Sequence, residues 1–415
     1  MTSSGTFPSR FSRILAVFGP GLVVMLADTE VGSIVTAGQS GVQWGYRMLL
    51  LQLLLMPVLY MVQELTVRLG IFTGRGHGEL IKEHFGSFWA WVSVAGLGIA
   101  TFGALLTEFS GVAGVGEMYG VTRGTSLLFT VAVLLVVVLT GSYRRVERVA
   151  MAFGLFELVF FFVAAAAHPS LSEMATESLQ IPYANKDYLY LAAANIGAVI
   201  MPWMVFYQQS AVADKKLGPE HFAIARVDTI LGSILTQLIM AAVLITCAAT
   251  IGHQHTDAAL STVGDMSRAL TPFLGDSVGR LVFGFGVLGA GLVAAIVVSL
   301  AFAWGVGEVT GYRHSLEDHP LKAHCFYGIY TVCVLSSALL VWGWPNLIAL
   351  NIGVEVMNAM LLPLVLGFLI LLAARTLPEA HRLKGAALVG AIFVAILTAG
   401  LGVFGGLQGA GLLSL

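Results

Sequence analysis

Apolar runs alternate with short polar stretches along almost the whole chain, and each run is long enough to cross a bilayer. A transmembrane helix needs about 20 mostly apolar residues, and eleven runs meet this requirement. They cover residues 13–41, 45–70, 87–117, 124–142, 148–168, 188–212, 223–251, 276–308, 325–343, 346–374 and 385–410. The pattern predicts an all-α polytopic membrane protein, a single transmembrane domain over residues 1–415 with no separate soluble part.

The composition supports a lipid-exposed fold. Hydrophobic residues make up 57% of the 415 residues and charged residues 11%, whereas soluble domains carry about 25% charged residues. The net charge of −2 gives no reason to expect a nucleic-acid partner. No hydrolase or metalloprotease motif occurs, so we expect the lipid bilayer as partner, no catalytic residues, no resident cofactor and no enzyme activity.

Basic residues are distributed unequally between the two sets of loops. Of the 21 Lys and Arg residues, only five belong to the loops on one side, and the other sixteen belong to the opposite side. The five are Arg47, Arg123, Lys186, Arg268 and Arg280. Because cytoplasmic loops are enriched in Lys and Arg, we expect the N-terminus in the cytoplasm and, after eleven spans, the C-terminus outside, in the cell membrane of a prokaryote.

The first apolar run is interrupted by two carboxylates, Asp28 and Glu30. A charge at the centre of a bilayer costs at least about 2.5–3.5 kcal/mol, so two charges need a reason. A cation site supplies one, since carboxylates and the carbonyls of unwound backbone, here near Ala27, are hard oxygen ligands. Alternatively, the two acids lie at the end of a shorter helix and face water.

The sixth run contains Pro202 after Ala198 and Met201. Proline removes one backbone donor and clashes with the preceding turn, so it kinks or breaks a helix. Five spans separate the starts of the first and sixth runs, which gives two halves of opposite topology. This pattern predicts inverted repeats over residues 13–168 and 188–374, an extra helix over residues 385–410, and a binding site where the two broken helices meet.

Three further segments resemble the NRAMP family of divalent metal transporters, which has the LeuT-like five-plus-five fold. They are Gly19-Pro20, the segment 39–46 and the segment 68–74, which match the first two helices of the family and the following loop. Ungapped counting then places Glu30 and Ser33 on the Asp and Asn of the first-helix motif of the family. The sixth-helix motif keeps Ala198 and Met201, but Trp203 replaces its His.

In its departures from the family pattern, the chain is most similar to the prokaryotic branch of NRAMP-related magnesium transporters. Asp28 is an extra acid, and Leu105 replaces a third-helix acid found in relatives. The resemblance implies Mg²⁺ or Mn²⁺ as the transported ion, held partly hydrated, without obligatory proton coupling. Met201 favours softer ions such as Mn²⁺, although it is equally well explained as a packing residue.

The expected metal-site residues are Asp28, Glu30, Ser33, Ala27, Ala198, Met201 and Glu355. A second group is expected along the ion path or around the ligands: Glu108, Gln208, Asn358 and Trp203. Glu355 and Asn358 lie three residues apart and therefore share a helix face. Each of these polar residues also has a purely structural interpretation, as a buried acid with a partner or as an interhelical hydrogen bond.

We therefore expect a divalent metal transporter that works by alternating access, most simply as a monomer. Alternatives are a proton-coupled transporter of Mn²⁺ or Fe²⁺, a LeuT-like transporter of a small organic solute, and a channel or metal sensor. The carboxylates speak against an anionic solute, because they would repel it.

Overall fold

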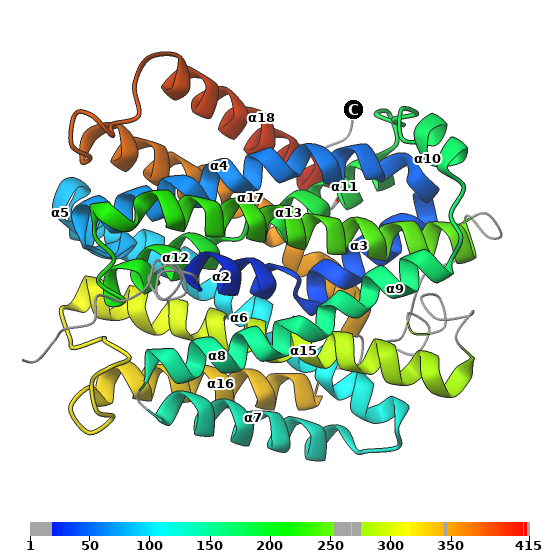
Figure 1. Ribbon diagram of the computed structural model, residues 1–415, viewed down its shortest axis with the longest axis horizontal. Coiled ribbons are helices and arrows are strands. Elements are labelled where there is room, and N and C mark those ends of the chain that lie inside the picture. The colour runs from blue at the N-terminus through cyan, green and yellow to red at the C-terminus, as the bar shows by residue number, and fades with distance from the viewer. Residues whose placement is uncertain are drawn as a thin grey trace, which may run out of the picture.

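Every predicted span appears as helix in the computed structural model (Figure 1). The structure describes residues 19–140, 142–252, 267, 275–343, 347–409 and 411–412. The start of the first predicted run and most of the predicted outer loop after the seventh lie outside these residues. Nine helical segments in the described part are long and apolar enough to cross a membrane, and the shorter α7 (Arg123–Leu139) is also apolar.

The first five spans follow the predicted order closely. They begin with a short pair, α2 (Pro20–Asp28) and α3 (Val31–Trp44). Next come the turn η1 (Gly45–Met48), the long helix α4 (Leu49–Thr73), the short α5 (His77–Phe85), the long α6 (Ser87–Met118) and α7. The fifth span consists of α8 (Tyr143–Gly154), the 3₁₀ turn η2 (Leu155–Leu158) and α9 (Val159–Ala166). This interruption of the fifth span is a feature that the hydropathy pattern does not predict.

The second set of spans begins after α10 (Leu171–Glu177). It contains α11 (Lys186–Val199), α12 (Pro202–Asp214), η3 (Pro219–His221), α13 (Phe222–Cys247) with η4 (Ala248–Gly252), α15 (Asp276–Thr310), α16 (His324–Gly343) and α17 (Leu347–Arg375), and α18 (Gly385–Gly409) follows as the extra helix. The first and sixth spans are both divided in the middle. The predicted all-α fold with broken helices 1 and 6 is therefore confirmed.

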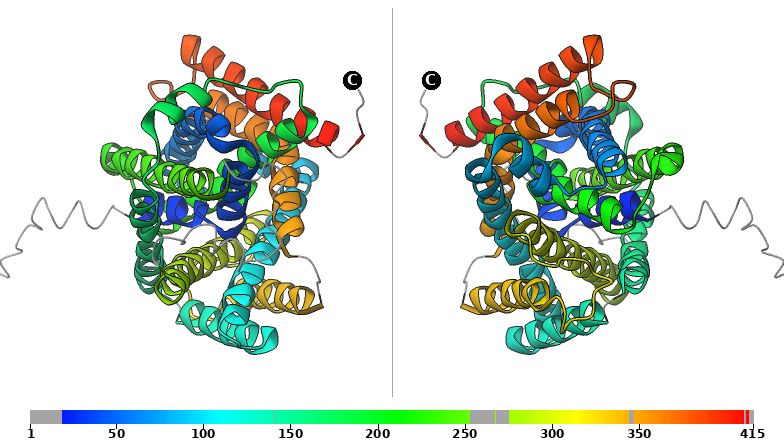
Figure 2. Two further views of the ribbon diagram at one scale, coloured as in Figure 1. Left: turned by 90° about the vertical axis from the view of Figure 1, so that its right-hand side faces the viewer. Right: turned by 90° about the vertical axis from the view of Figure 1, so that its left-hand side faces the viewer.

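The broken first span lies inside the bundle and the unbroken outer helices face lipid. In Figure 1, α2 lies near the centre of the view, and both end views in Figure 2 place α18 at one edge and α7 with α16 at the opposite edge. Every residue of α2 except Leu22 is buried. By contrast, α7 exposes Leu128, Phe129 and Val136, and α18 exposes Phe393 and Ile396. This inside-out distribution of apolar side chains suits a helix bundle that is solvated by lipid tails.

Glycine allows the sixth and tenth spans to approach each other closely. A Cβ atom at Gly197 of α11 would collide with the backbone oxygen of Glu355 in α17, and it would lie 2.8 Å from the backbone nitrogen of Ala359. The two backbones therefore touch at the level of the helix breaks. Small residues at such contacts are typical of membrane helix packing.

We expect Gly197→Ala to lower the melting temperature of the purified protein, because backbone atoms cannot move aside for the new methyl group. Overpacking of this kind costs about 1–3 kcal/mol. The matched control is Gly367→Ala in α17, where no atom lies within 4 Å of the added Cβ; it should keep or slightly raise the melting temperature. Equal melting temperatures for the two variants would contradict this close contact.

Candidate cation site at the helix breaks

The break in the first span directs two carboxylates toward different neighbours. Helix α2 ends at Asp28 and α3 begins at Val31, and Glu30 between them is extended, with φ −76° and ψ 170°. Thr236 of α13 donates a hydrogen bond of 3.4 Å to Asp28 Oδ2. The Glu30 carboxyl points instead toward α6 and α17, where Glu108 and Glu355 are close enough to act on it electrostatically.

Each half of the broken span is capped at its N-terminus by a carboxylate from a distant span. Asp228 of α13 accepts hydrogen bonds from the backbone nitrogens of Gly21 at 2.8 Å and Gly19 at 3.2 Å. Glu108 of α6 accepts one from Val31 at 3.3 Å. Negative charge stabilises the free amides of a helix N-terminus, so these contacts help to fix the two half-helices in place.

The cap on α3 has a consequence for the end of α2. In an unbroken helix the amide of Val31 would donate to the carbonyl of Ala27, but here it donates to Glu108. The Ala27 carbonyl therefore faces the break without its helical donor. Backbone oxygens freed in this way are suitable cation ligands.

Glu30 and Glu355 converge above Gly32. A Cβ atom at Gly32 would collide with Glu355 Oε1 and would lie 3.1 Å from Glu30 Oε1, so both oxygens use the space that glycine leaves. Asn358 donates to Glu355 Oε2 at 3.1 Å. The two oxygens of Glu30 and Oε1 of Glu355 are buried and have no hydrogen-bond partner of good geometry in the structure. Unpaired carboxylate oxygens that face each other are the arrangement a bound cation would complete.

The second break lies beside the first. Pro202 begins α12, and Met201 before it is extended, with φ −102° and ψ 143°. Ser33 of α3 donates to the backbone oxygen of Ala198 at 3.0 Å, which joins the two broken spans directly. Trp203 is fully buried and its indole nitrogen has no acceptor.

The whole cluster is closed to water. Asp28, Glu30, Glu108 and Glu355 have no exposed surface. The structure therefore shows an occluded arrangement, and the alternative in which Asp28 and Glu30 end a shorter, water-facing helix is wrong.

The expected residue Gln208 lies away from the breaks. Its amide oxygen accepts from Thr66 of α4 at 2.8 Å, and its amide nitrogen donates to Thr229 of α13 at 3.1 Å. These bonds connect α4, α12 and α13 and occupy both ends of the amide. A role on the ion path stays a prediction for this residue.

Sequence reasoning did not predict the contacts of several residues around the cluster. The capping role of Asp228 and the steric role of Gly32 depend on contacts between distant spans, so neither has a local signal. Glu157 of η2 is fully buried and lies beside Thr29 and near Asp28. An acid inside an otherwise apolar run was the available signal for Glu157, but it did not reveal which neighbours the residue has.

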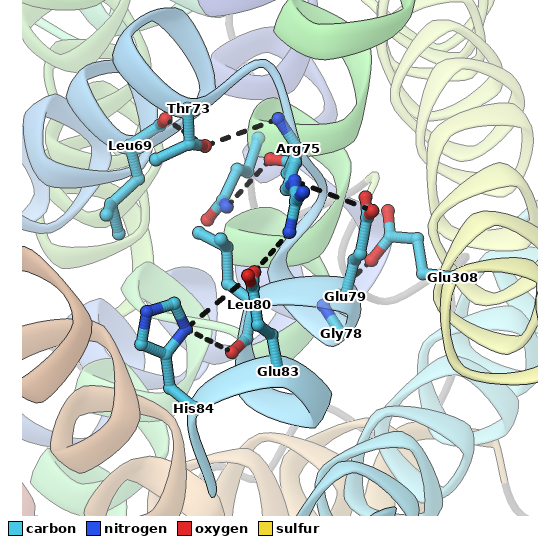
Figure 3. A network of polar contacts seen from close by, with 10 residues as sticks. Leu69, Thr73, Arg75, Gly78, Glu79, Leu80, Glu83, His84 and Glu308 are labelled. Carbon is cyan, nitrogen blue, oxygen red and sulfur yellow. Dashed lines mark hydrogen bonds and ion pairs between the residues drawn. The ribbon is translucent and has the colours of Figure 1, made fainter. Parts of the chain in front are cut away.

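A second polar region lies at the end of the bundle where α4 and α15 end (Figure 3). Glu308 of α15 accepts from the backbone nitrogen of Gly78 at 2.8 Å and from Ser210 at 2.5 Å. Arg75 pairs with Glu83 and, at 3.7 Å, with Glu79. These contacts fasten α5 to α12 and α15.

His77 belongs to the same region but stays uncharged. It is fully buried and shares a hydrogen bond of 2.9 Å with Gln209. Burial lowers the pKa of this imidazole from 6.5 to about 4, because a charged ring loses its hydration there. A cavity of about 390 Å³ next to it is lined by Glu79, Asp214, Glu308 and Asp318.

Solved structures with a similar fold include a manganese transporter. The crystal structure of an Eremococcus coleocola manganese transporter in complex with an aromatic bis-isothiourea compound has a TM-score of 0.73 at 16% identity, covering 96% of this chain and 87% of that one. MhsT in complex with L-phenylalanine has a TM-score of 0.63 at 12% identity, covering 96% and 99%. The fold is thus that of the LeuT-like transporters.

Sequence comparison identifies the family. The Nramp family model, described as "Natural resistance-associated macrophage protein-like", matches residues 21–408. The chain therefore belongs to the Nramp family. The divalent metal cation transporter MntH of Brucella suis is 28% identical over 315 residues, covering 71% of this chain and 67% of the relative. MntH 1 of Pseudomonas aeruginosa is 29% identical over 324 residues, covering 70% and 69%.

We expect Gly32→Ala to weaken divalent-cation binding at least about tenfold while leaving the melting temperature nearly unchanged. The added methyl group displaces the flexible ends of Glu355 and Glu30 rather than backbone, so the fold can adapt while the oxygens separate. Calorimetric titration of the purified protein with Mn²⁺ and a thermal-unfolding scan give the two quantities. Unchanged affinity would show that the space above Gly32 does not matter for a cation.

Proposed function

We propose that the chain is a divalent metal cation transporter of the Nramp type, with Mg²⁺ or Mn²⁺ as its cargo. The single observation that carries this proposal is the pair of buried carboxylates Glu30 and Glu355 at the helix breaks, of whose four oxygens only Oε2 of Glu355 has a hydrogen-bond donor. The groups that act on them electrostatically are other carboxylates. A buried charge without compensation is strongly destabilising, and one divalent ion would balance both carboxylates.

The proposed ligand set combines side chains and backbone. Glu30 and Glu355 supply the charge, Asp28 adds a carboxylate, and the carbonyl of Ala27 is free of its helical donor. Ser33, the carbonyl of Ala198 and the sulfur of Met201 come from the contact between the two breaks. Glu108 and Asn358 hold the surroundings, since they bond to Val31 and Glu355.

One feature supports a partly hydrated, hard ion such as Mg²⁺. In the described residues, no three His, Cys, Asp or Glu side chains converge closely enough to hold a metal directly, so water would complete the shell. Mg²⁺ sheds water reluctantly and usually keeps several of its waters in proteins. Met201 is the one soft donor at the breaks and supports Mn²⁺ as a second substrate.

We further propose that transport does not require proton coupling. Trp203 and Leu105 occupy positions where relatives, by resemblance, carry a His and an acid that titrate. Both are buried and neither side chain can exchange a proton at neutral pH. The alternative cargo suggested by MhsT, an organic solute, is less consistent with this site because the carboxylates would repel a carboxylate-bearing ligand.

Alternating access would follow from movement of the spans that contain the breaks. The bundle formed by α2–α3, α4, α11–α12 and α13 would rock against the remaining spans, opening the occluded cluster to one side and then the other. We propose a monomer in the cell membrane of a prokaryote, with the N-terminus in the cytoplasm and the C-terminus outside.

The test is cation flux into liposomes that contain the purified protein, followed together with luminal pH. Native protein should show saturable entry of Mg²⁺ and of Mn²⁺ without acidification. Glu30→Gln should lower both fluxes at least about tenfold, because it removes one of the two charges that balance the ion. The control Glu379→Gln changes an exposed carboxylate far along the chain and should transport like the native protein.

The possible failures separate the parts of the proposal. Flux accompanied by acidification would keep the metal site and overturn the uncoupled mechanism. A rate that rises linearly with ion concentration would indicate a channel. No entry of either metal would overturn the metal-transport function itself.

A further inference from the structure

A fifth carboxylate, Glu157, reaches the break in the first span from the fifth span, whereas Glu355 belongs to the tenth. Glu157 lies in η2, the 3₁₀ turn that interrupts the fifth span between α8 and α9. A 3₁₀ turn has fewer residues per turn than an α-helix, so its side chains point in other directions than those of a continuous α-helix would. The Glu157 side chain is fully buried. Thr29 lies beside its carboxyl, and Asp28 is near enough to act on it electrostatically.

The oxygens in this corner are only partly satisfied by the protein. Both carboxylate oxygens of Glu157 and Oδ1 of Asp28 are buried without a hydrogen-bond partner of good geometry. The nearby hydroxyls of Thr29 and Thr236 bond to each other at 2.7 Å, and Thr236 also reaches Asp28 Oδ2 at 3.4 Å. Buried polar atoms in proteins are almost always paired. The unpaired oxygens of Asp28 and Glu157 therefore indicate that a partner from outside the chain binds in this corner.

The charges lead to the same conclusion. Asp28, Glu30, Glu108, Glu157 and Glu355 are five buried carboxyl groups, and none of the groups that act on them is basic. One divalent ion balances only two negative charges. The remaining carboxyl groups are neutral only while they hold a proton, and a second cation would balance two of them in the ionised form.

The two pairs of carboxylates are also distinct in space. Glu30 and Glu355 meet above Gly32, on the side of α3 that faces α17. Asp28 and Glu157 lie on the side that faces α13 and η2. The potential metal ligands in the second corner are all hard oxygen atoms, which suit Mg²⁺ better than softer ions.

We propose that Glu157, with the hydroxyls of Thr29 and Thr236 and with Asp28 as a carboxylate shared between the two sites, forms a second binding site for a hard divalent cation. The identity of the ion rests on the function proposed above, whereas the existence of the site rests on the geometry of this corner. Two neighbouring cation sites on one path weaken each other by repulsion, so occupation of the second site would promote release from the first.

The test is the stoichiometry of Mg²⁺ binding to the purified full-length protein, measured by equilibrium dialysis with metal analysis. Native protein should bind two ions per chain. Glu157→Gln should lose one of them, with the affinity of that site lowered at least about tenfold, and should keep the other. Glu30→Gln should show the reverse pattern, losing the ion held between Glu30 and Glu355.

Conservative and surface variants control for loss of fold. Glu157→Asp keeps the charge and should recover measurable binding at the second site, which a purely structural role of Glu157 would not require. Glu379→Gln should bind like the native protein, and all variants should elute as the same species in size-exclusion chromatography.

The outcomes distinguish the two proposals. One ion per chain in the native protein, unchanged in Glu157→Gln and lost in Glu30→Gln, would overturn the second site and keep the proposed function. Loss of one ion in Glu157→Gln with unchanged binding in Glu30→Gln would support the second site and contradict the Glu30–Glu355 site. Absence of Mg²⁺ binding in the native protein would overturn both.

Discussion

A cluster of buried carboxyl groups without a basic partner is the constraint on which the rest of this structure depends. Helix α2 stops at Asp28 and α3 begins at Val31, so the break presents carboxylates and free carbonyls to a space that water does not reach. Unpaired charges at membrane depth are costly and are kept for ion pathways and binding sites. A bound cation would supply the partner that these carboxylates and carbonyls lack. The same feature therefore accounts for the break in the helix, the binding site and the proposed transport function.

The architecture around the charges holds them together. Carboxylates cap the two half-helices at their N-termini, Asp228 on α2 and Glu108 on α3. Ser33 connects the first break to the second, and glycine at position 197 brings α17 with Glu355 against α11. The contacts of Ser33 with Ala198 and of Asp228 with α2 lie inside the proposed moving bundle, whereas Glu108 of α6 and Glu355 of α17 lie outside it. Movement of the bundle would therefore change the position of Glu30 relative to Glu108 and Glu355, as alternating access requires.

The spans and both breaks could be predicted from sequence because their causes are local. Long apolar runs specify spans, Pro202 interrupts a helix, and Asp28 and Glu30, two residues apart in an apolar run, indicate a polar interruption of the first span. The contacts of the site could not be predicted in this way. That Gly32 makes room for Glu355, that Asp228 caps α2 and that Glu157 faces Thr29 depends on the relative placement of spans more than a hundred residues apart. Gln208 shows the converse, since its polarity suggested the ion path and its bonds hold α4 to α13.

The most direct test of the central claim is to locate the ion. Crystals of the protein grown with Mn²⁺ should show an anomalous difference peak between the carboxylates of Glu30 and Glu355, above Gly32 and beside the carbonyl of Ala27. A peak at this position would place the cargo on the charges that the fold leaves unbalanced. Crystals that diffract well and contain Mn²⁺ only at the protein surface, with the Glu30 and Glu355 carboxyls still facing each other, would contradict the account.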